Sequence, residues 1–388
     1  MLFSNTIVNG VRRDVFIADG LIQSIAPAGT LVRSEGTPIV NGGCITPHFA
    51  EPHVHLDAAL LGARMPNRSG TLVEGIQNWS QLRANLTTED VIHRARQVCE
   101  MYAQTGTTTL RTHVDTGSLL AVEALLEVRE TLKAEGTTLE VVAFPQEGIF
   151  RVEGGQAQWE QAIALGCDVV GAIPHFERTT EEGWDSVRLA FDLAEKYGRK
   201  IDMHCDETDD PNSRNLEVLC AETIKRSMQG QVVASHCTAM HSYPNPYAAK
   251  VIQLVVDSEV IIVTNPLDNI VLQGRYDGYP RRRGHPRIDE LWQAGATVAI
   301  GHDSVMDPWY RLGTANLMDA AYMLVHYAHL TSEADMKRIV TTLSSENHLP
   351  FGTVPNLDVG APANVLWWSQ EDLIDILRLR PTPKVFHA

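Results

Sequence analysis

The sequence predicts an α/β protein: a distorted (β/α)8 barrel, the TIM-barrel architecture, with a small β-sandwich-like domain built from both chain ends. From about residue 44 onward, short apolar runs alternate with longer amphipathic segments, and this pair recurs eight times. A length of 388 residues also suits a barrel with a small appendage. Short strand-like segments joined by Asn-Gly and Asp-Gly precede the alternation and predict the appendage.

The small domain is predicted from segments at both ends of the chain. Strands are expected over 2–8 and 13–18, separated by the hairpin-type dipeptide Asn9-Gly10, and a third is expected at 21–25. Near the other end, the apolar stretch 365–368 is expected to rejoin this layer as a strand. We therefore assign residues 1–47 plus 351–388 to the small β domain and residues 48–350 to the barrel.

Eight apolar runs are the predicted barrel strands: 44–49, 108–114, 139–145, 168–174, 200–205, 232–237, 260–265 and 297–301. Helix-like stretches are expected between most of them and after the last, at 88–104, 119–133, 158–165, 180–197, 215–228, 314–329 and 333–343. The segment 56–79 is expected to be a long loop that covers the barrel mouth.

Composition and charge exclude several function classes. Hydrophobic residues make up 44% and charged residues 21%, as in an ordinary globular protein, and no stretch approaches 18 consecutive apolar residues. The net charge of −16 disfavours nucleic acid and anionic membranes as partners, but it does not disfavour a small neutral substrate. Residues 1–20 lack an apolar signal-peptide core, so a cytoplasmic location is expected. The six cysteines are scattered, which disfavours thiolate zinc sites and disulfide frameworks.

Titratable residues gather where the predicted strands end. The first strand leads into His53-Val54-His55, and alternate residues of a strand project on the same side. His-x-His also arises by chance, so this tripeptide alone does not decide between a metal site and two exposed rings. Later strand ends carry further polar residues: RTHVD (111–115), FPQEG (144–148), IPHFE (173–177), MHCDE (203–207), SHCT (235–238) and GHDS (301–304). Because barrel active sites lie at the carboxyl ends of the strands, this distribution predicts an active site there.

The residue types in this set suit one divalent metal. Three neutral imidazoles and a carboxylate, from His53, His55, His204 and Asp303, suit zinc or ferrous iron with one position open for water. Glu207, three residues beyond His204, is close enough to serve as a proton shuttle, and His236 could orient or polarise the attacked atom. Each residue alone has an ordinary structural explanation, whereas the ordered set favours catalysis.

The chain resembles the amidohydrolase superfamily and, within it, bacterial cytosine deaminase. The segments that carry the resemblance include EPHVHLD (51–57), RTHVD (111–115), VAFPQEGI (142–149), DMHCDE (202–207), ASHCTAMHSY (234–243) and GHDSVMDPWYRLGTAN (301–316). His-x-His is weakly specific by itself, but this ordered set over roughly residues 43–316 is highly specific. The superfamily oligomerises often, so a homo-oligomer is one expectation.

The resemblance implies a site and a reaction. The implied ligands of one divalent metal, zinc or iron(II), are His53, His55, His204 and Asp303. The implied catalytic residues are Glu207, which protonates ring N3, His236, which assists the attacking water, and Asp303, which passes a proton to the leaving amine. The implied substrate contacts are Gln146 at the ring carbonyl and N1 side, and Leu72, Ser304 and Trp309 around the ring. The implied reaction is hydrolytic deamination of a free cytosine-type base, cytosine to uracil and 5-methylcytosine to thymine, with release of ammonia.

Other functions are less well supported by the sequence. Two-metal members of the superfamily commonly carry a carboxylated lysine after strand four, where this chain has Pro174-His175-Phe176, so cyclic-amide hydrolases are disfavoured. The P-C-x-x-C motif of the other deaminase design is missing. A deaminase of another amino-heterocycle, such as isoguanine or a pterin, stays open. A metal-binding protein without turnover is a different class, and Glu207 argues against it because a mere binder needs no proton shuttle.

The chain departs from the family pattern at Ser304. The family has two adjacent aspartates after strand eight, whereas here Asp303 is followed by a serine. We expect Ser304 to open space beside C5 of the ring and to remove a carboxylate that an apolar substituent would desolvate. 5-Methylcytosine would then be accepted, unless Ser304 only holds a water molecule in place of the carboxylate. The C-terminal segment is also shorter than in the family, which leaves open whether the small β layer is complete.

Overall fold

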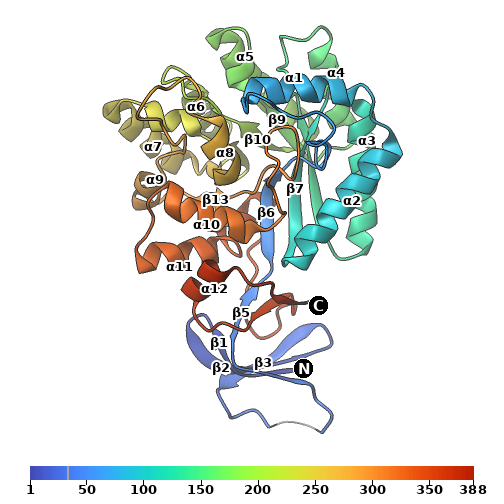
Figure 1. Cartoon of the computed structure of the whole chain (residues 1–388), viewed down its shortest axis with the longest axis vertical. Coiled ribbons are helices and arrows are strands. Elements are labelled where there is room, and N and C mark those ends of the chain that lie inside the picture. Colours follow the sequence, from blue (N-terminus) through green and yellow to red (C-terminus); the bar gives the residue numbers. More distant parts are fainter. Residues whose placement is uncertain (33–34) are drawn as a thin grey trace.

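The computed structural model describes residues 1–32 and 35–388 and has two parts (Figure 1). The larger part contains an eight-stranded sheet whose strands pair in chain order and in parallel: β6 (Phe49–Val54), β7 (Thr107–Asp115), β8 (Thr138–Phe144), β9 (Val169–Ala172), β10 (Lys200–His204), β11 (Val232–Ser235), β12 (Ile261–Thr264) and β13 (Val298–Ile300). A parallel bridge between Val54 and Asp303 brings the end of β13 back to β6. The predicted barrel is therefore confirmed, in a nearly closed form.

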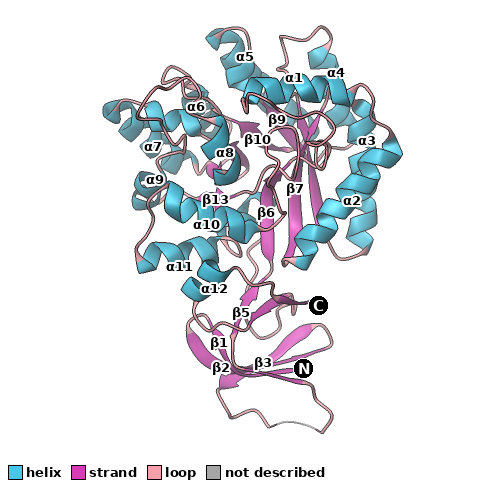
Figure 2. Ribbon diagram, viewed as in Figure 1, coloured by secondary structure: helices cyan, strands magenta, loops and turns pink. Residues whose placement is uncertain are grey.

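Helices surround this sheet (Figure 2). In chain order they are α1 (Leu72–Arg83), α2 (Thr88–Gln104), α3 (Leu119–Ala134), α4 (Gly155–Leu165), α5 (Thr180–Tyr197), α6 (Asn215–Lys225), α7 (Asn245–Ser258), α8 (Pro266–Leu272), α9 (Ile288–Ala294), α10 (Leu317–Tyr327) and α11 (Glu333–Thr342). Three short 3-10 helices, η1 (Pro174–Phe176), η2 (Thr238–Ser242) and η3 (Glu346–Phe351), lie in the connections. Hydroxyl caps begin several helices, since Thr87, Ser118 and Thr179 each accept a backbone N–H of the first turn.

The second part is a mixed seven-stranded sheet from both chain ends. Its strands are β1 (Leu2–Val8), β2 (Val11–Ala18), β3 (Leu21–Pro27), β4 (Ile39–Asn41), β5 (Cys44–Pro47), β14 (Val365–Trp368) and β15 (Lys384–Phe386). The order is β15-β14-β5-β1-β2-β3, with β4 also beside β1. α12 (Leu373–Leu379) connects the last two strands. The short C-terminal segment thus still contributes two strands, while the exact domain limits stay a prediction.

The first predicted barrel strand is wrong in its position. Residues 44–47 form β5, which pairs with β1 and β14 of the small sheet, and the barrel strand β6 begins only at Phe49. His48 lies between the two sheets and is buried, with Nδ1 3.0 Å from Thr108 Oγ1 and Nε2 2.8 Å from the Phe386 carbonyl oxygen. One apolar run thus serves two sheets, and periodicity alone does not mark the change.

The predicted loop over 56–79 is partly wrong, because its last part belongs to α1. Thr71 caps this helix by accepting the N–H of Glu74. The indole N–H of Trp79 donates to Asp115 Oδ2 at 2.7 Å, and Arg83 forms an ion pair with the same carboxylate. These contacts attach α1 to the carboxyl end of β7, so the helix lies over the barrel mouth.

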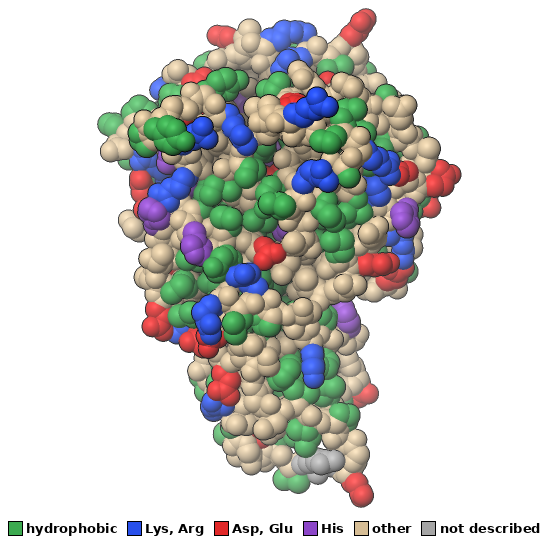
Figure 3. Space-filling view, viewed as in Figure 1, with side chains coloured by type: hydrophobic (Ala, Val, Ile, Leu, Met, Phe, Trp, Pro, Cys, Tyr) green, Lys and Arg blue, Asp and Glu red, His purple; other side chains and the backbone are tan. Residues whose placement is uncertain are grey.

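The visible surface, the helices and the thiols have these features. On the face shown in Figure 3, basic and acidic side chains are intermixed over both parts of the molecule. Within residues 1–32 and 35–388, no helix combines the length and the apolar character that crossing a bilayer requires. All six cysteines are buried with free thiols.

Candidate active site

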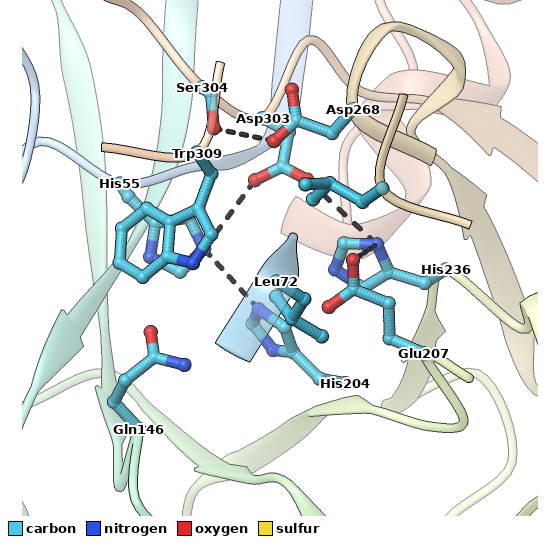
Figure 4. Close-up of a pocket in the computed structure, with 11 residues that line it drawn as sticks. His55, Leu72, Gln146, His204, Glu207, His236, Asp268, Asp303, Ser304 and Trp309 are labelled. Atoms are coloured by element: carbon cyan, nitrogen blue, oxygen red, sulfur yellow. Dashed lines mark hydrogen bonds and ion pairs between the residues drawn. The ribbon is translucent and has the colours of Figure 1, made fainter. Parts of the chain in front are cut away.

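The sequence-predicted residues meet in one pocket at the carboxyl ends of the barrel strands (Figure 4). The pocket has a volume of about 280 Å³ and is lined by His55, Leu72, Gln146, His204, Glu207, His236, Asp268, Leu272, Asp303, Ser304 and Trp309. His53 is fully buried directly behind it, with its ring centroid 4.6 Å from that of His204. The structure therefore brings all ten predicted site residues together.

Four of these residues form a compact cluster of donor atoms. Nε2 of His53 and Nε2 of His55 lie 3.6 Å and 3.5 Å from Oδ1 of Asp303. Nε2 of His204 lies 3.3 Å from Nε2 of His55. One nitrogen from each of the three histidines lies within 4.8 Å of the other two. The alternation at the end of β6 and the return of β13 beside it produce this convergence.

The neutral form of the three histidines suits the binding of a cation. Burial lowers the pKa of His55 to about 4 and the pKa values of His53 and His204 well below their ordinary range, so the rings are neutral and offer lone pairs. Burial, followed by the charge of Asp268, raises the pKa of Asp303. In the part of the chain that the structure describes, His53 Nε2 has no hydrogen-bond partner although it is buried. A divalent ion would satisfy these atoms, so the cluster is a buried, histidine-rich metal site.

A chain of buried hydrogen bonds orients His53. Nδ1 of His53 lies 3.0 Å from Oγ of Ser235, and the Ser235 hydroxyl donates to Asp202 Oδ1 at 2.8 Å. Arg111 in turn donates to the other oxygen of Asp202 at 2.9 Å. Because Ser235 donates to Asp202, its oxygen accepts from Nδ1–H of His53, which leaves the Nε2 lone pair facing Asp303. Charged residues within apolar strands were the sequence signal for this chain, which the sequence-based prediction did not include.

Glu207 and His236 lie side by side at the pocket. Nδ1 of His236 is 3.6 Å from Oε1 of Glu207 and 3.8 Å from Oδ2 of Asp303. The Asn269 amide N–H group lies 3.1 Å from Nδ1 of His236 and 3.3 Å from Oε1 of Glu207. Burial raises the pKa of Glu207 to about 8, so the side chain is a proton donor near neutrality. His236 and Asp303 both hold left-handed backbone conformations, with φ of 71° and 70°.

The walls of the pocket come from three different segments. Gln146 follows β8, and Leu72 is the first residue of α1. Trp309 lies 6.1 Å from His55 between ring centroids and packs against α1 at Gly75, where an added Cβ would collide with the indole. A larger outer cavity of about 1370 Å³ adjoins the pocket and shares Leu72, Glu207 and Leu272 with it.

The end of the seventh strand contributes residues that sequence reasoning missed. α8 follows β12 directly and places Asp268, Asn269 and Leu272 at the site. The hydroxyl of Ser304 donates to Oδ2 of Asp268 at 2.5 Å. Ser304 thus still faces a carboxylate on this side of the pocket, that of Asp268, and its expected role in admitting a C5 substituent stays a prediction. The run Asn-Pro-Leu-Asp-Asn after strand seven was the available signal.

Known proteins are similar to this chain in sequence or in fold. A model described as amidohydrolase family matches residues 70–383. The pterin deaminase of Rhizobium rhizogenes is 29% identical over 365 residues, with 92% of this chain and 82% of that protein covered. The N-isopropylammelide isopropyl amidohydrolase of Pseudomonas sp. is 27% identical, with 84% and 79% covered. The crystal structure of 5-methylcytosine deaminase from Klebsiella pneumoniae with 5-fluorocytosine has a TM-score of 0.95 and 39% identity, over 100% of this chain and 96% of that chain.

The family model spans most of the chain and includes every predicted site residue except His53 and His55, which lie just before its start. The fold and the buried metal site agree with the resemblance on which the sequence-based prediction relied. This protein therefore belongs to the amidohydrolase family and is a metal-dependent enzyme of that family.

Proposed function

We propose that the protein deaminates free cytosine-type bases, converting cytosine to uracil and 5-methylcytosine to thymine with release of ammonia. The observation that carries the proposal is one small pocket in which the ligand set, Glu207, His236 and Gln146 converge. The pocket is small and its lining is mostly polar, with Leu72, Leu272 and Trp309 as apolar walls, which suits a single polar ring. The 39% identity to a 5-methylcytosine deaminase adds support.

The proposed metal ligands are His53, His55, His204 and Asp303, which suit one zinc or iron(II) ion. When bound, the ion would act as a Lewis acid that makes a water molecule nucleophilic near neutral pH. The residues of the chain then have distinct tasks in the proposed reaction. Asp303 takes a proton from the attacking water and passes it to the leaving amine, and His236 holds the attacking group beside Asp303.

Substrate recognition and ring protonation follow from the same geometry. Glu207, buried and protonated near neutrality, gives its proton to ring N3 as C4 is attacked. The amide of Gln146 pairs with the ring carbonyl and N1, which fixes the ring orientation. The C4–N bond then breaks and ammonia leaves, while the second proton of the attacking water passes to Glu207 and restores its protonated form, so that the ring carries a carbonyl in place of the amine.

A second substrate class has its own support. The relative from Rhizobium rhizogenes is a pterin deaminase, and the outer cavity, which shares Leu72, Glu207 and Leu272 with the pocket, would accommodate part of a bicyclic ring. A pterin or isoguanine is therefore the alternative substrate. The two proposals differ in which base releases ammonia.

The test is ammonia release from zinc-loaded or iron-loaded protein offered cytosine, 5-methylcytosine, isoguanine and pterin in parallel. We expect both cytosines to be turned over. The matched control is Glu207→Gln, which should keep its metal and lose activity by about 10²–10⁴-fold, the usual contribution of a positioned acid. Ammonia from pterin or isoguanine only would replace the proposal by its alternative. Full activity in Glu207→Gln would refute the role of Glu207.

A further inference from the structure

Asp268 is a buried carboxylate that lines the pocket and that the proposed reaction has not used. Its side chain is 2% exposed. One oxygen, Oδ2, accepts the hydroxyl of Ser304 at 2.5 Å. The other oxygen, Oδ1, has no hydrogen-bond partner among the residues that the structure describes. The carboxylate is therefore held in place on one side and open on the other.

The side chains around Asp268 give Oδ1 no hydrogen-bond donor among the residues that the structure describes. The other acidic groups nearby are Asp303, Asp307 and Glu207, and none of them donates a hydrogen bond to Oδ1 in the part of the chain that the structure describes. Asp307 already accepts the backbone N–H groups of Trp309 and Tyr310, both at 2.9 Å. Burying an acceptor without a hydrogen bond costs free energy, so we expect an N–H group of a bound ligand to donate to Oδ1.

The position of Asp268 in the pocket indicates which part of a ligand it meets. In Figure 4, Asp268 lies next to Asp303 and Ser304, on the side of the pocket away from Gln146. If Gln146 pairs with the ring carbonyl and Asp303 hands a proton to the leaving amine, the amino group of the substrate lies on the Asp268 side. The open oxygen is thus placed for an amine N–H.

We propose that Asp268 is a specificity-determining residue that accepts an N–H of the substrate's exocyclic amino group through Oδ1, while Ser304 holds Oδ2. The inference rests on the proposed function. As water adds and the C4–N bond breaks, the amine nitrogen gains a proton by way of Asp303 and leaves as ammonia, still donating one N–H to Asp268. The new ring carbonyl has no hydrogen to donate, so Asp268 disfavours the product and substrates whose leaving group lacks N–H.

The experiment compares two leaving groups on the same ring. Zinc-loaded wild type and Asp268→Asn are assayed with cytosine and with 4-methoxy-2-pyrimidinone, which loses methanol instead of ammonia. In the variant, Ser304 would donate to the carbonyl oxygen of the new side chain, so that its amide N–H₂ group would face the amine. We expect kcat/KM for cytosine to fall about 10- to 100-fold, the effect of losing a buried hydrogen bond and leaving its donor unpaired, while kcat/KM for the methoxy compound changes much less. Inhibition by uracil should become stronger, because the amide can donate to its carbonyl.

Asp307→Asn is the matched control, because it removes a buried acid of the same cluster that does not line the pocket. It should leave the cytosine-to-methoxy ratio unchanged. Ser304→Ala is a second variant in case Asp268→Asn does not fold, and it should lower the same ratio by a smaller factor. A ratio that stays at the wild-type value in the folded variants would overturn the inference, even with wild-type deamination intact. If the wild type deaminates neither cytosine nor 5-methylcytosine, the proposed function is wrong, and the inference about Asp268 is wrong with it.

Discussion

Replacing Ser235 by alanine should weaken metal binding without touching a metal ligand. Ser235 Oγ lies 3.0 Å from Nδ1 of His53 and donates to Asp202 at 2.8 Å, and all three side chains are buried. Alanine removes the acceptor of Nδ1–H and leaves this donor unpaired. Such a donor costs about 1–3 kcal/mol, which corresponds to roughly 5- to 150-fold in an equilibrium constant. Outer hydrogen-bond partners of metal ligands usually contribute about 10- to 100-fold to metal affinity, in agreement with this range.

The assay is a zinc titration of the metal-free protein against a chromogenic chelator, with metal content measured after dialysis. Ser235→Ala should bind zinc about 10- to 100-fold more weakly than the wild type. Ser235→Thr keeps a hydroxyl at the same position, so it is the control that separates loss of the hydrogen bond from the effect of any substitution at this buried site. Equal zinc affinity in Ser235→Ala and the wild type would refute the reasoning, because it would mean that the hydrogen bond to His53 does not orient this ligand.

Two further perturbations test the pocket and the junction of the two sheets. Ser304→Asp places a second carboxylate against Asp268, so we expect a lower melting temperature, which adding Asp268→Asn should partly restore. The same substitution should reduce the preference for 5-methylcytosine over cytosine by about tenfold or more. An unchanged preference would exclude a specificity role for Ser304. Burial lowers the pKa of His48 from 6.5 to about 4, so its contribution to stability is present above about pH 6.5 and is lost as the pH falls toward 4, by up to about 3 kcal/mol. Urea unfolding at pH 7.5 and 4.5 should therefore show that the free energy of unfolding falls less on acidification in His48→Gln than in the wild type. An equal fall in both proteins would contradict this account.

The barrel and most of the site follow from the sequence because local patterns encode them. Strand–helix alternation is a local property, and barrel topology gathers strand ends at one face, so the sequence alone predicts that His53, His55, His204 and Asp303 lie close together. The reach of Glu207 toward the site also follows from its short distance in sequence from His204. These predictions required only that each side chain lie at or just after the end of a strand.

Other features depend on tertiary contacts that a local pattern does not contain. Asp268 lies in the run Asn-Pro-Leu-Asp-Asn after the seventh barrel strand, which has no histidine or other typical metal ligand beside it. Only the packing of the folded chain shows that its carboxylate lies beside Ser304. The residues 44–47 look like the start of a barrel strand, but they pair with strands from distant parts of the chain. The helix over residues 72–83 was missed although Thr71 and Glu74 have the spacing of a helix N-terminus. The length of the segment after the first barrel strand favoured a loop. In the structure, the hydrogen bond from Trp79 to Asp115 instead holds this helix against the end of β7.

The most direct test of the proposed function is the ratio of kcat/KM for 5-methylcytosine to kcat/KM for cytosine, measured with metal-loaded wild-type protein. The account predicts that both bases release ammonia and that 5-methylcytosine is turned over at least as efficiently as cytosine. Such a ratio would make salvage of methylated base to thymine part of the enzyme's activity. Turnover of cytosine alone would contradict the specificity assigned to this pocket, and ammonia from neither base would contradict the proposed substrate class.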